Sequence, residues 1–254
     1  CDILIGGPPC QPFSVGGKQA GLDDARDGFP TFLDAVARLK PKIALIENVR
    51  GLLYRNKRYF EEIGNRLISL GYKVHFELLN AKKYGVPQNR ERVIIIATHV
   101  GWEWPSHETN MVKAGEALGP LASQYDDESF FLTPNIDAYI ARYEKASKCI
   151  NPRDLHMDRP ARTLTCRNLH GRTGDMHRIK LPDGRRRSLT VREAARLQSF
   201  PDWFQFEGRE NQQFQQIGNA VAPLFAYKLA TQVKSALSGK LDDTPTFIQQ
   251  SLFG

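Results

Sequence analysis

The stretch GGPPCQPFS, residues 6–14, holds a single cysteine among prolines, directly after the short apolar run DILI. Proline fixes the backbone φ angle and removes a hydrogen-bond donor, so we expect a stiff loop that aims the Cys10 thiol in one direction. A thiol held in this way suits nucleophilic catalysis, because the thiolate is the reactive form of cysteine. A free cysteine can also fill a small apolar gap, and this stretch alone leaves both interpretations open.

The elements that must position this loop alternate between strands and helices up to about residue 98. Apolar runs of strand length alternate with segments whose apolar residues recur every three or four positions, as in FPTFLDAVARL and KRYFEEIGNRLISLG. This alternation predicts an α/β fold with a parallel, doubly wound sheet. Ligands bind at the carboxyl ends of strands in such sheets, so GGPPC and the pair Glu47–Asn48 are expected at one rim.

The composition bounds the class of protein. With 254 residues, of which 41% are hydrophobic, the chain can bury a core in one sizeable or two smaller domains. No apolar run approaches the roughly 20 residues of a membrane-spanning helix, and no signal peptide is visible. The four cysteines show no CxxC spacing, so neither a zinc site nor a disulfide framework is indicated, and a reducing cytosol is expected. Because the chain begins with Cys1 and enters a strand almost at once, we expect further sequence upstream.

Positive charge is concentrated in one part of the chain. The net charge is +7, and the stretch from Arg159 to Arg196 holds 11 Lys or Arg against 3 Asp or Glu, so the remainder is close to neutral. Charge runs are often ordinary solvated surface, but this concentration favours a polyanionic partner, with nucleic acid as the leading candidate.

Beyond residue 98 the regular alternation is lost. Residues 99–158 are typical of loops with scattered aromatic side chains, and only IDAYIARYEKA predicts a helix. LPDG predicts a turn, TVREAARLQ a short helix, and the segment after GNAVAP a longer helix. Trp102 and Trp104 could wedge between bases, although packing is the commoner use of such residues.

Five motifs occur in the order found in the cytosine-5 DNA methyltransferases: GGPPCQPFS, ENV, QNRER, LTVREAARLQSFPD and QIGNAVAP. Each is weak alone, but together they make the chain similar to this family, of the bacterial restriction–modification type, outside residues 99–158. The resemblance implies part of a Rossmann-like methyltransferase sheet and a smaller, irregular target-recognition region. We expect a catalytic part at residues 1–98, target recognition at 99–195, and a C-terminal helix within 196–254 that returns to the catalytic part.

The resemblance implies transfer of a methyl group to C5 of a cytosine that is flipped out of a specific duplex DNA sequence. Cytosine C5 is a poor nucleophile, and a thiolate adding at C6 activates it, which assigns Cys10 as the nucleophile. Glu47 matches the carboxylic acid that holds or protonates N3, and Arg92 matches the cation at O2. Arg90 matches a position that takes part in catalysis or braces the site; a phosphate contact or a structural ion pair is the alternative.

The same resemblance supplies expected DNA contacts. The glycine-rich segment GGKQAGLDDARDG follows the cysteine loop and could close over a flipped base. Contacts to DNA are expected from Gln11, Ser14, Lys18, Arg26, Gln88, Thr163 and Arg167. For Lys18 and Arg26 the alternative is an ordinary solvated cation, and for Gln88 it is a role in organising the turn between strands.

The resemblance also names S-adenosyl-L-methionine as the methyl donor. Its expected contacts in this chain are Pro9, Thr31 or Phe32, Asn219 and Ala220. A plain helix N-cap is the alternative for Gly218 and Asn219. The family's Phe-x-Gly-x-Gly turn and acidic ribose-binding residue are not found in the sequence. We therefore expect the rest of the cofactor site on a missing N-terminal segment or a second subunit, and a chain that is inactive alone.

Two other classes of function stay open at this point. An RNA cytosine-5 methyltransferase acting on transfer RNA would use the same chemistry. A DNA-binding partner subunit would need none of Cys10, Glu47 and Arg92. No metal and no membrane partner are expected, and a bacterial, cytoplasmic, nucleoid-associated enzyme fits these features best.

Overall fold

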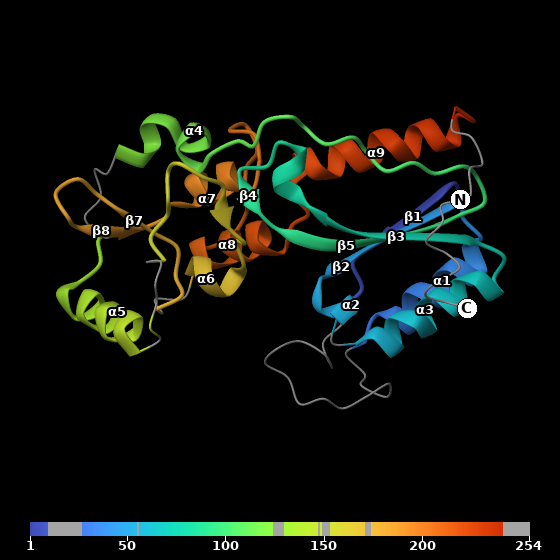
Figure 1. The fold of residues 1–254 in the computed structure, drawn as a ribbon, viewed down its shortest axis with the longest axis horizontal. Coiled ribbons are helices and arrows are strands. Elements are labelled where there is room, and N and C mark those ends of the chain that lie inside the picture. The colour runs from blue at the N-terminus through green and yellow to red at the C-terminus, as the bar shows by residue number, and fades with distance from the viewer. Residues whose placement is uncertain are drawn as a thin grey trace. The chain divides into compact units, whose positions relative to one another are not determined.

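The computed structural model describes residues 1–9, 27–54, 56–123, 130–146, 148, 153–170 and 174–240. The chain forms two compact units, whose elements are drawn in Figure 1. Unit 1 consists of residues 1–80, 91–106 and 228–254, and unit 2 of residues 81–90 and 107–227. The QNRER motif is therefore divided, with Arg90 in unit 2 and Arg92 in unit 1. The expected boundaries at residues 98 and 195 separate catalysis from target recognition. The division into compact units does not test that assignment.

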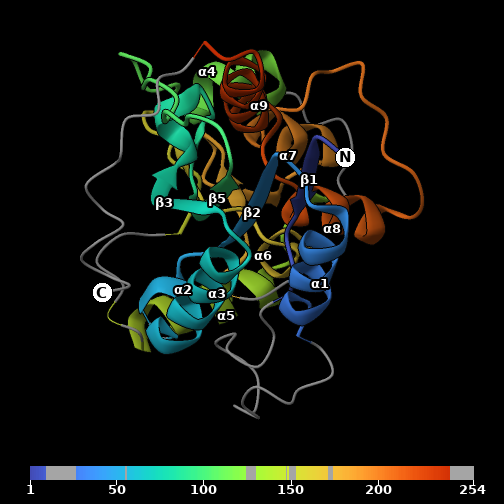
Figure 2. The same cartoon turned by 90° about the vertical axis from the view of Figure 1, so that its right-hand side faces the viewer.

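Unit 1 is built on a four-stranded sheet in the order β1-β2-β5-β3. Its strands are β1 (Ile3–Gly6), β2 (Ile43–Val49), β3 (Lys73–Asn80) and β5 (Glu91–Thr98). Figure 2 shows α1 (Phe29–Leu39) and α3 (Lys57–Ser69) on the same face of this sheet. Phe29, Phe60 and Ile95 belong to one buried core there, as the apolar spacing of the two helices predicts. The short helix α2 (Gly51–Tyr54) follows β2.

Strand β5 runs antiparallel to both of its neighbours, β2 and β3, whereas β1 and β2 are parallel. The predicted α/β fold is confirmed, but the prediction of a wholly parallel sheet is wrong. Parallel neighbours need a crossover connection long enough for a helix, and only residues 81–90 connect β3 to β5. This short connection, folded as the 3₁₀ helix η3 (Ala81–Tyr84) and strand β4 (Gln88–Asn89), reverses the chain.

Unit 2 is mostly helical and irregular. Strand β4 pairs in parallel with β6 (Ala161–Arg162), and β7 (Arg178–Lys180) forms a hairpin with β8 (Arg186–Ser188). The predicted LPDG turn joins the hairpin strands, and its Gly184 has the positive φ of +89° that favours glycine.

The helical segments beyond β5 are α4 (Ala114–Leu118), η4 (Gly119–Ser123), α5 (Pro134–Ala146), α6 (Cys166–His170), α7 (Val191–Leu197), α8 (Glu210–Asn219) and α9 (Pro223–Leu237). The predicted helices within 136–146 and 190–198 are confirmed. Helix α8 has few apolar residues, so the sequence pattern does not predict it. In the part of the chain that the structure describes, no helix has the length and apolarity needed to cross a membrane.

Candidate active site and nucleic-acid interface

In unit 1, Glu47 and Arg92 form an ion pair at one rim of the sheet. Glu47 lies near the carboxyl end of β2 and Arg92 near the beginning of β5, where the register places Arg92 opposite Val49. The Arg92 Nε lies 2.9 Å from the Glu47 Oε1, and the two side chains are 13% and 19% exposed. Two of the predicted catalytic side chains therefore meet in a position that is largely, but not wholly, buried.

The reversed direction of β5 makes this pairing possible. In a parallel sheet, the beginning of β5 would lie at the opposite rim from the end of β2. Arg92 also donates from Nη1 to the backbone carbonyl of Glu91 at 2.7 Å. Among the described residues its Nη2 has no hydrogen-bond partner, so this nitrogen can meet a substrate oxygen. Burial lowers the pKa of Arg92, and the negative charge of Glu47 opposes that change.

The loop that leads to the cysteine is fixed by backbone contacts. Asn48, which is buried, donates from Nδ2 to the carbonyl of Pro8 at 2.9 Å. The amide of Gly28 donates to the carbonyl of Pro9 at 3.1 Å. The prolines and these two hydrogen bonds together support the prediction of a stiff loop.

The same loop passes close to the Glu47 carboxylate. A Cβ on Gly7 would lie 3.5 Å from the Glu47 Oε2, so the backbone here is at contact distance from the acid. The next residue after Pro9 is Cys10. The predicted nucleophile lies outside the described residues, as do four expected DNA contacts, Gln11, Ser14, Lys18 and Arg26.

The expected cofactor contacts of unit 1 gather at the first turn of α1. The amide of Phe32 donates to the carbonyl of Gly28 at 3.1 Å, and Gly28 in turn holds Pro9. A Cβ on Gly6 would come within 2.5 Å of the Phe32 ring, so the ring is used in packing against this glycine. Pro9 and Thr31 are exposed, whereas Phe32 is half-buried. Pro9 and Thr31 thus have open surfaces that fit contact with a ligand.

In unit 2, Arg90 is 3% exposed and its guanidinium holds three backbone carbonyls. Nη1 donates to Leu164 at 2.8 Å, and Nη2 donates to Gly218 at 3.1 Å and to Ala220 at 3.2 Å. A guanidinium enclosed in this way does not face a substrate. The bracing interpretation of Arg90 fits this geometry, and direct participation in catalysis does not.

Gln88 is fully buried, which contradicts the expected contact to DNA. Its Nε2 donates to the carbonyl of Leu197 at 3.2 Å and to the side-chain oxygen of Gln198, while its Oε1 accepts from the amide of Leu164 at 2.9 Å. Both ends of the Gln88 amide are used inside the unit, so it organises the turn instead. Gln198 was not predicted from the sequence, where its only indication of a role is its place in the motif LTVREAARLQSFPD.

Three other predicted contacts of unit 2 reach the surface. Arg167 and Asn219 are exposed, and Thr163 is partly exposed. The Thr163 hydroxyl donates to the carbonyl of Asn89 at 2.7 Å. A phosphate contact by this hydroxyl therefore requires its bond to Asn89 to be exchanged.

Gly218 and Asn219 end helix α8, so the alternative of a helix N-cap is wrong. The reason for glycine at 218 is a close approach of two backbones. A Cβ on Gly218 would lie 2.3 Å from the backbone nitrogen of Cys166, at the beginning of α6. No side chain fits between these two segments.

The basic stretch from Arg159 to Arg196 is largely neutralised inside unit 2. The Arg178 side chain is wholly buried between Glu144 and Asp154, at 2.6 and 2.5 Å. Further ion pairs join Arg162 to Asp175, Arg185 to Asp183, Arg186 to Asp154 and Asp137, Arg187 to Glu193, and Arg196 to Asp202. From the sequence alone, the charge excess of this stretch favours a polyanionic partner. Because most of these cations are paired inside unit 2, the excess overstates the positive charge available to such a partner. Among the described residues, exposed Arg167 has no ion-pair partner.

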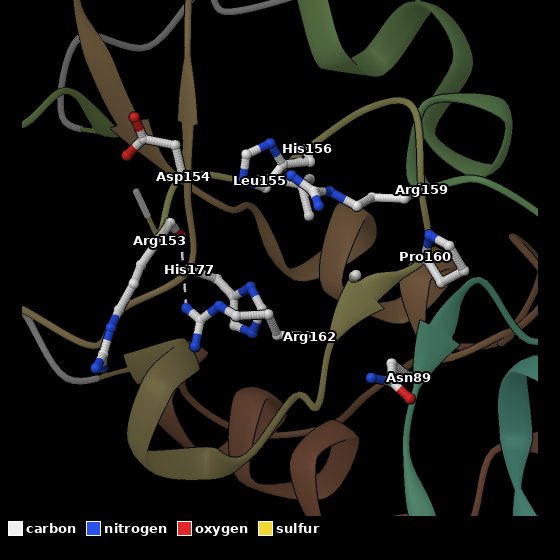
Figure 3. A pocket seen from close by; sticks show the side chains of 10 residues that line it. Asn89, Arg153, Asp154, Leu155, His156, Arg159, Pro160, Arg162 and His177 are labelled. Carbon is white, nitrogen blue, oxygen red and sulfur yellow. Dashed lines mark hydrogen bonds between the residues drawn. The ribbon is translucent and has the colours of Figure 1, made fainter. Parts of the chain in front are cut away.

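A pocket of about 230 Å³ in unit 2 keeps part of this charge accessible, and Figure 3 shows Arg153, Arg159 and Arg162 around it. Arg153 and Arg162 both pair with the single carboxylate of Asp175. The side chains of the three arginines are 30%, 53% and 40% exposed. Each of the three guanidinium groups therefore keeps some contact with solvent, although that of Arg153 points away from that of Arg159 in Figure 3.

His177 forms the buried side of this pocket and is 2% exposed. Burial, reinforced by the nearby charge of Arg162, lowers the pKa of His177 to about 3, so its imidazole is neutral near pH 7. Its Nε2 lies 3.4 Å from the carbonyl of Thr163, and since a carbonyl only accepts, Nε2 carries the hydrogen. His177 therefore adds no positive charge to the pocket near pH 7.

A sequence profile of the C-5 cytosine-specific DNA methylases matches residues 1–235. The chain belongs to this family. A type II methyltransferase, M.AplI of Arthrospira platensis, is 57% identical over 241 residues, which cover 94% of this C-5 methylase and 70% of M.AplI. M.NgoMIV of Neisseria gonorrhoeae is 36% identical over 254 residues, covering 93% and 78% of the two chains. The family resemblance and the predicted class of enzyme, a DNA cytosine-5 methyltransferase of the restriction–modification type, are confirmed.

Solved structures agree with this fold. The methyltransferase EhMeth of Entamoeba histolytica and Dnmt2 of S. pombe each superpose on the C-5 methylase with a TM-score of 0.70, at 21% and 20% identity. The matches cover 93% of this chain and 78% and 79% of the other two. At such low identity they show a shared methyltransferase fold.

Packing is also observed for Trp102, which the sequence left open as a wedge between bases. Its side chain is 4% exposed and meets Trp104 edge to face, with ring centroids 5.5 Å apart. This buried position fits the packing alternative.

Proposed function

We propose that this C-5 methylase transfers a methyl group from S-adenosyl-L-methionine to C5 of a cytosine flipped out of a specific duplex DNA sequence, through a covalent bond between Cys10 and C6. The Glu47–Arg92 pair carries this proposal, with its 2.9 Å contact beside the loop that leads to Cys10. A cytosine ring under attack at C6 needs a carboxyl group at N3 and a cation at O2. The pair supplies both groups from adjacent strands.

In the proposed reaction the Cys10 thiolate forms the S–C6 bond, and the π electrons of the C5=C6 bond move toward C5 and the N3–C2–O2 part of the ring. Glu47 holds N3 through a hydrogen bond or a proton, and Arg92 stabilises the charge at O2. C5 then takes up the methyl group, and the electron pair of the broken S–CH3 bond stays on the donor sulfur, which becomes a thioether. A base takes the C5 proton, and cleavage of the S–C6 bond restores the C5=C6 double bond and releases Cys10 as the thiolate.

S-adenosyl-L-methionine supplies an electrophilic methyl group bonded to a sulfonium. The residues present fit a share of its binding site: the exposed Pro9 and Thr31 in unit 1, and the exposed Asn219 in unit 2. In unit 1 Phe32 packs against Gly6, and in unit 2 the Ala220 carbonyl accepts from Arg90 and Gln198, so each of these two residues is engaged inside its own unit.

For DNA, the proposal assigns target recognition to residues 99–195 and the chemistry to residues 1–98, with 196–254 completing the catalytic part. Arg159 and Arg162, which line the pocket of Figure 3, support a binding site for a backbone phosphate, which protrudes from the duplex and so suits a concave site. Exposed Arg167 supports a second phosphate contact. Gln11, Ser14, Lys18 and Arg26 stay proposals that rest on the family resemblance.

Trapping with 5-fluorocytosine tests the covalent step. Fluorine at C5 blocks the final elimination, so the complete enzyme with S-adenosyl-L-methionine and a duplex containing 5-fluorocytosine should give an adduct that survives denaturing electrophoresis. Cys10→Ser should abolish the adduct and retain DNA binding. Cys1→Ser is the matched control, because Cys1 is an exposed free cysteine of unit 1 to which no role is assigned, and it should be trapped like the wild type. An adduct that persists in Cys10→Ser contradicts the assignment, and methylation of transfer RNA in place of duplex DNA supports the RNA alternative.

A further inference from the structure

We infer that Arg90 is a positioning residue that couples the DNA-contacting segment at residues 163–166 to the cofactor-contacting turn at residues 218–220, so that each ligand changes the affinity for the other. The inference rests on the proposed function, which assigns Thr163 to DNA and Asn219 to the cofactor. It concerns contacts inside unit 2 only.

The first link is the Arg90 guanidinium itself. One nitrogen holds the carbonyl of Leu164, and the other holds the carbonyls of Gly218 and Ala220, at 2.8 to 3.2 Å. A guanidinium is planar and its N–H groups point in fixed directions, so it sets the spacing of the carbonyls that it joins. Leu164 directly follows Thr163, and Gly218 and Ala220 flank Asn219. The clamp therefore fixes the backbone on both sides of the predicted ligand contacts.

A second link runs beside the first through two buried amides. The Leu164 amide donates to Gln88, Gln88 donates to the side chain of Gln198, and Gln198 donates to the carbonyls of Ile217 and Ala220 at 3.0 and 2.9 Å. Gln88 and Gln198 are both 0% exposed. Buried hydrogen bonds of this kind are costly to leave unmade, so the segments that they join move together.

The third link is the backbone contact between Gly218 and Cys166. Because a Cβ on Gly218 would lie 2.3 Å from the Cys166 nitrogen, the two segments have no room to slide past each other. A displacement of residues 163–166 by a bound phosphate must therefore be passed to residues 218–220. Thermodynamic linkage makes the effect reciprocal: a ligand at the turn biases the position of the DNA-contacting segment by the same free energy.

The test measures coupling rather than activity. S-adenosylhomocysteine cannot donate a methyl group, and its dissociation constant is determined by calorimetry on the complete enzyme, with all parts of the cofactor site present. The titration is done without DNA and with a saturating duplex that carries a site methylated by the wild-type enzyme. We expect DNA to tighten binding in the wild type by about 5- to 150-fold, the usual range of coupling between sites. Arg90→Lys keeps the positive charge but loses the planar guanidinium and its several N–H donors. In this variant the factor by which DNA tightens binding should fall to within about twofold of one.

Arg192→Lys is the matched control. The Arg192 guanidinium also donates to two backbone carbonyls of unit 2, those of Pro201 and Phe204 at 3.4 and 3.1 Å, and neither belongs to the two coupled segments. This variant should keep the wild-type coupling factor even where thermal stability falls as much as in Arg90→Lys.

Three outcomes overturn the inference: a wild-type factor of one, an Arg90→Lys variant with wild-type coupling, or an equal loss of coupling in Arg192→Lys. Failure of the proposed function gives a different result. The wild type would then bind no S-adenosylhomocysteine, with or without DNA, or would not bind the duplex. A coupling factor lost only in Arg90→Lys supports the positioning role.

Discussion

Two arginine–glutamate pairs, one in each unit, show opposite uses of the same chemistry. Glu47 and Arg92 at the rim of the unit 1 sheet are joined by one contact, and both side chains keep some exposed surface. Arg187 and Glu193 in unit 2 are each 1% exposed and joined by two hydrogen bonds, one to each carboxylate oxygen, at 2.6 and 2.8 Å. The unit 1 pair is open to a substrate, and the unit 2 pair is closed.

The closed pair is surrounded by further partners. Glu193 also accepts from the backbone and the hydroxyl of Thr190, the N-cap of α7, while Arg187 also donates to the carbonyls of Leu121 and Ala122. The pair thus joins three segments of unit 2 and leaves little capacity for a ligand. Residue type and charge do not distinguish these two cases; the number of donors and acceptors left for a ligand does.

The open pair gives the largest expected effect on activity. Glu47→Gln removes the group that holds N3 during addition, so methyl transfer to duplex DNA should slow by roughly 10²–10⁴-fold, the range of a general acid. The free energy of unfolding should change little, because glutamine still accepts from Arg92 and both side chains keep contact with solvent, unlike those of Arg187 and Glu193. Transfer of labelled methyl groups and urea denaturation measure the two quantities.

Glu91→Gln is the matched control for this variant. Glu91 pairs with Arg50 at 2.7 Å on the same unit, and both side chains are well exposed. This variant should methylate DNA at the wild-type rate. Near-normal turnover in Glu47→Gln would instead make Glu47 a structural residue.

The closed pair gives the largest expected effect on stability. Glu193→Gln leaves the Arg187 charge buried without its counterion, so the free energy of unfolding should fall by about 3–5 kcal/mol. Asp202→Asn breaks the surface pair between Arg196 and Asp202, whose side chains are 27% and 55% exposed, and should leave the free energy of unfolding nearly unchanged. Urea denaturation of both variants checks the contrast, and similar losses would show that burial does not separate the two kinds of pair.

The sequence predicted the individual elements better than their directions. The motifs placed Glu47 and Arg92 on strands, but an all-parallel sheet would have separated them, and the short connection at residues 81–90 is what reverses β5. The sequence pattern alone also could not tell Arg90 from Arg92. The two arginines are two residues apart, yet one is enclosed by three carbonyls and the other is partly open. That difference depends on residues 164 and 218–220, which are far away in the chain.

The neutral histidine of unit 2 gives a smaller, pH-dependent effect. The folded-state pKa of His177 is lowered to about 3 from the ordinary 6.5, so between these values only the unfolded chain binds the proton. This contribution to stability is therefore complete above pH 6.5 and is lost as the pH falls toward 3. At pH 5 the loss should be about 2 kcal/mol, at roughly 1.4 kcal/mol for each pH unit.

Unfolding in urea at pH 7 and pH 5 measures this contribution. His177→Gln keeps a donor for the Thr163 carbonyl and removes the titrating group, so it should lose about 2 kcal/mol less than the wild type between the two pH values. His170→Gln removes an exposed histidine of the same unit and controls for the loss of an imidazole. Equal pH dependence in wild type and His177→Gln would show that this histidine does not titrate during unfolding.

The smallest expected effect separates cations that are available to DNA from those that are paired. Arg167 is exposed with no ion-pair partner among the described residues, whereas Arg185 pairs with Asp183 at 2.6 Å and lies over the Phe131 ring at 4.3 Å. Each phosphate contact releases counterions, so Arg167→Ala should reduce the slope of log affinity against log salt by about one unit. Arg185→Ala should leave the slope unchanged, because its charge is already neutralised inside unit 2. Fluorescence anisotropy with a labelled duplex over a salt series measures both slopes. Equal reductions of the two slopes would mean that DNA displaces Asp183 from Arg185. An ion pair of this length would then leave its arginine available to bind a phosphate.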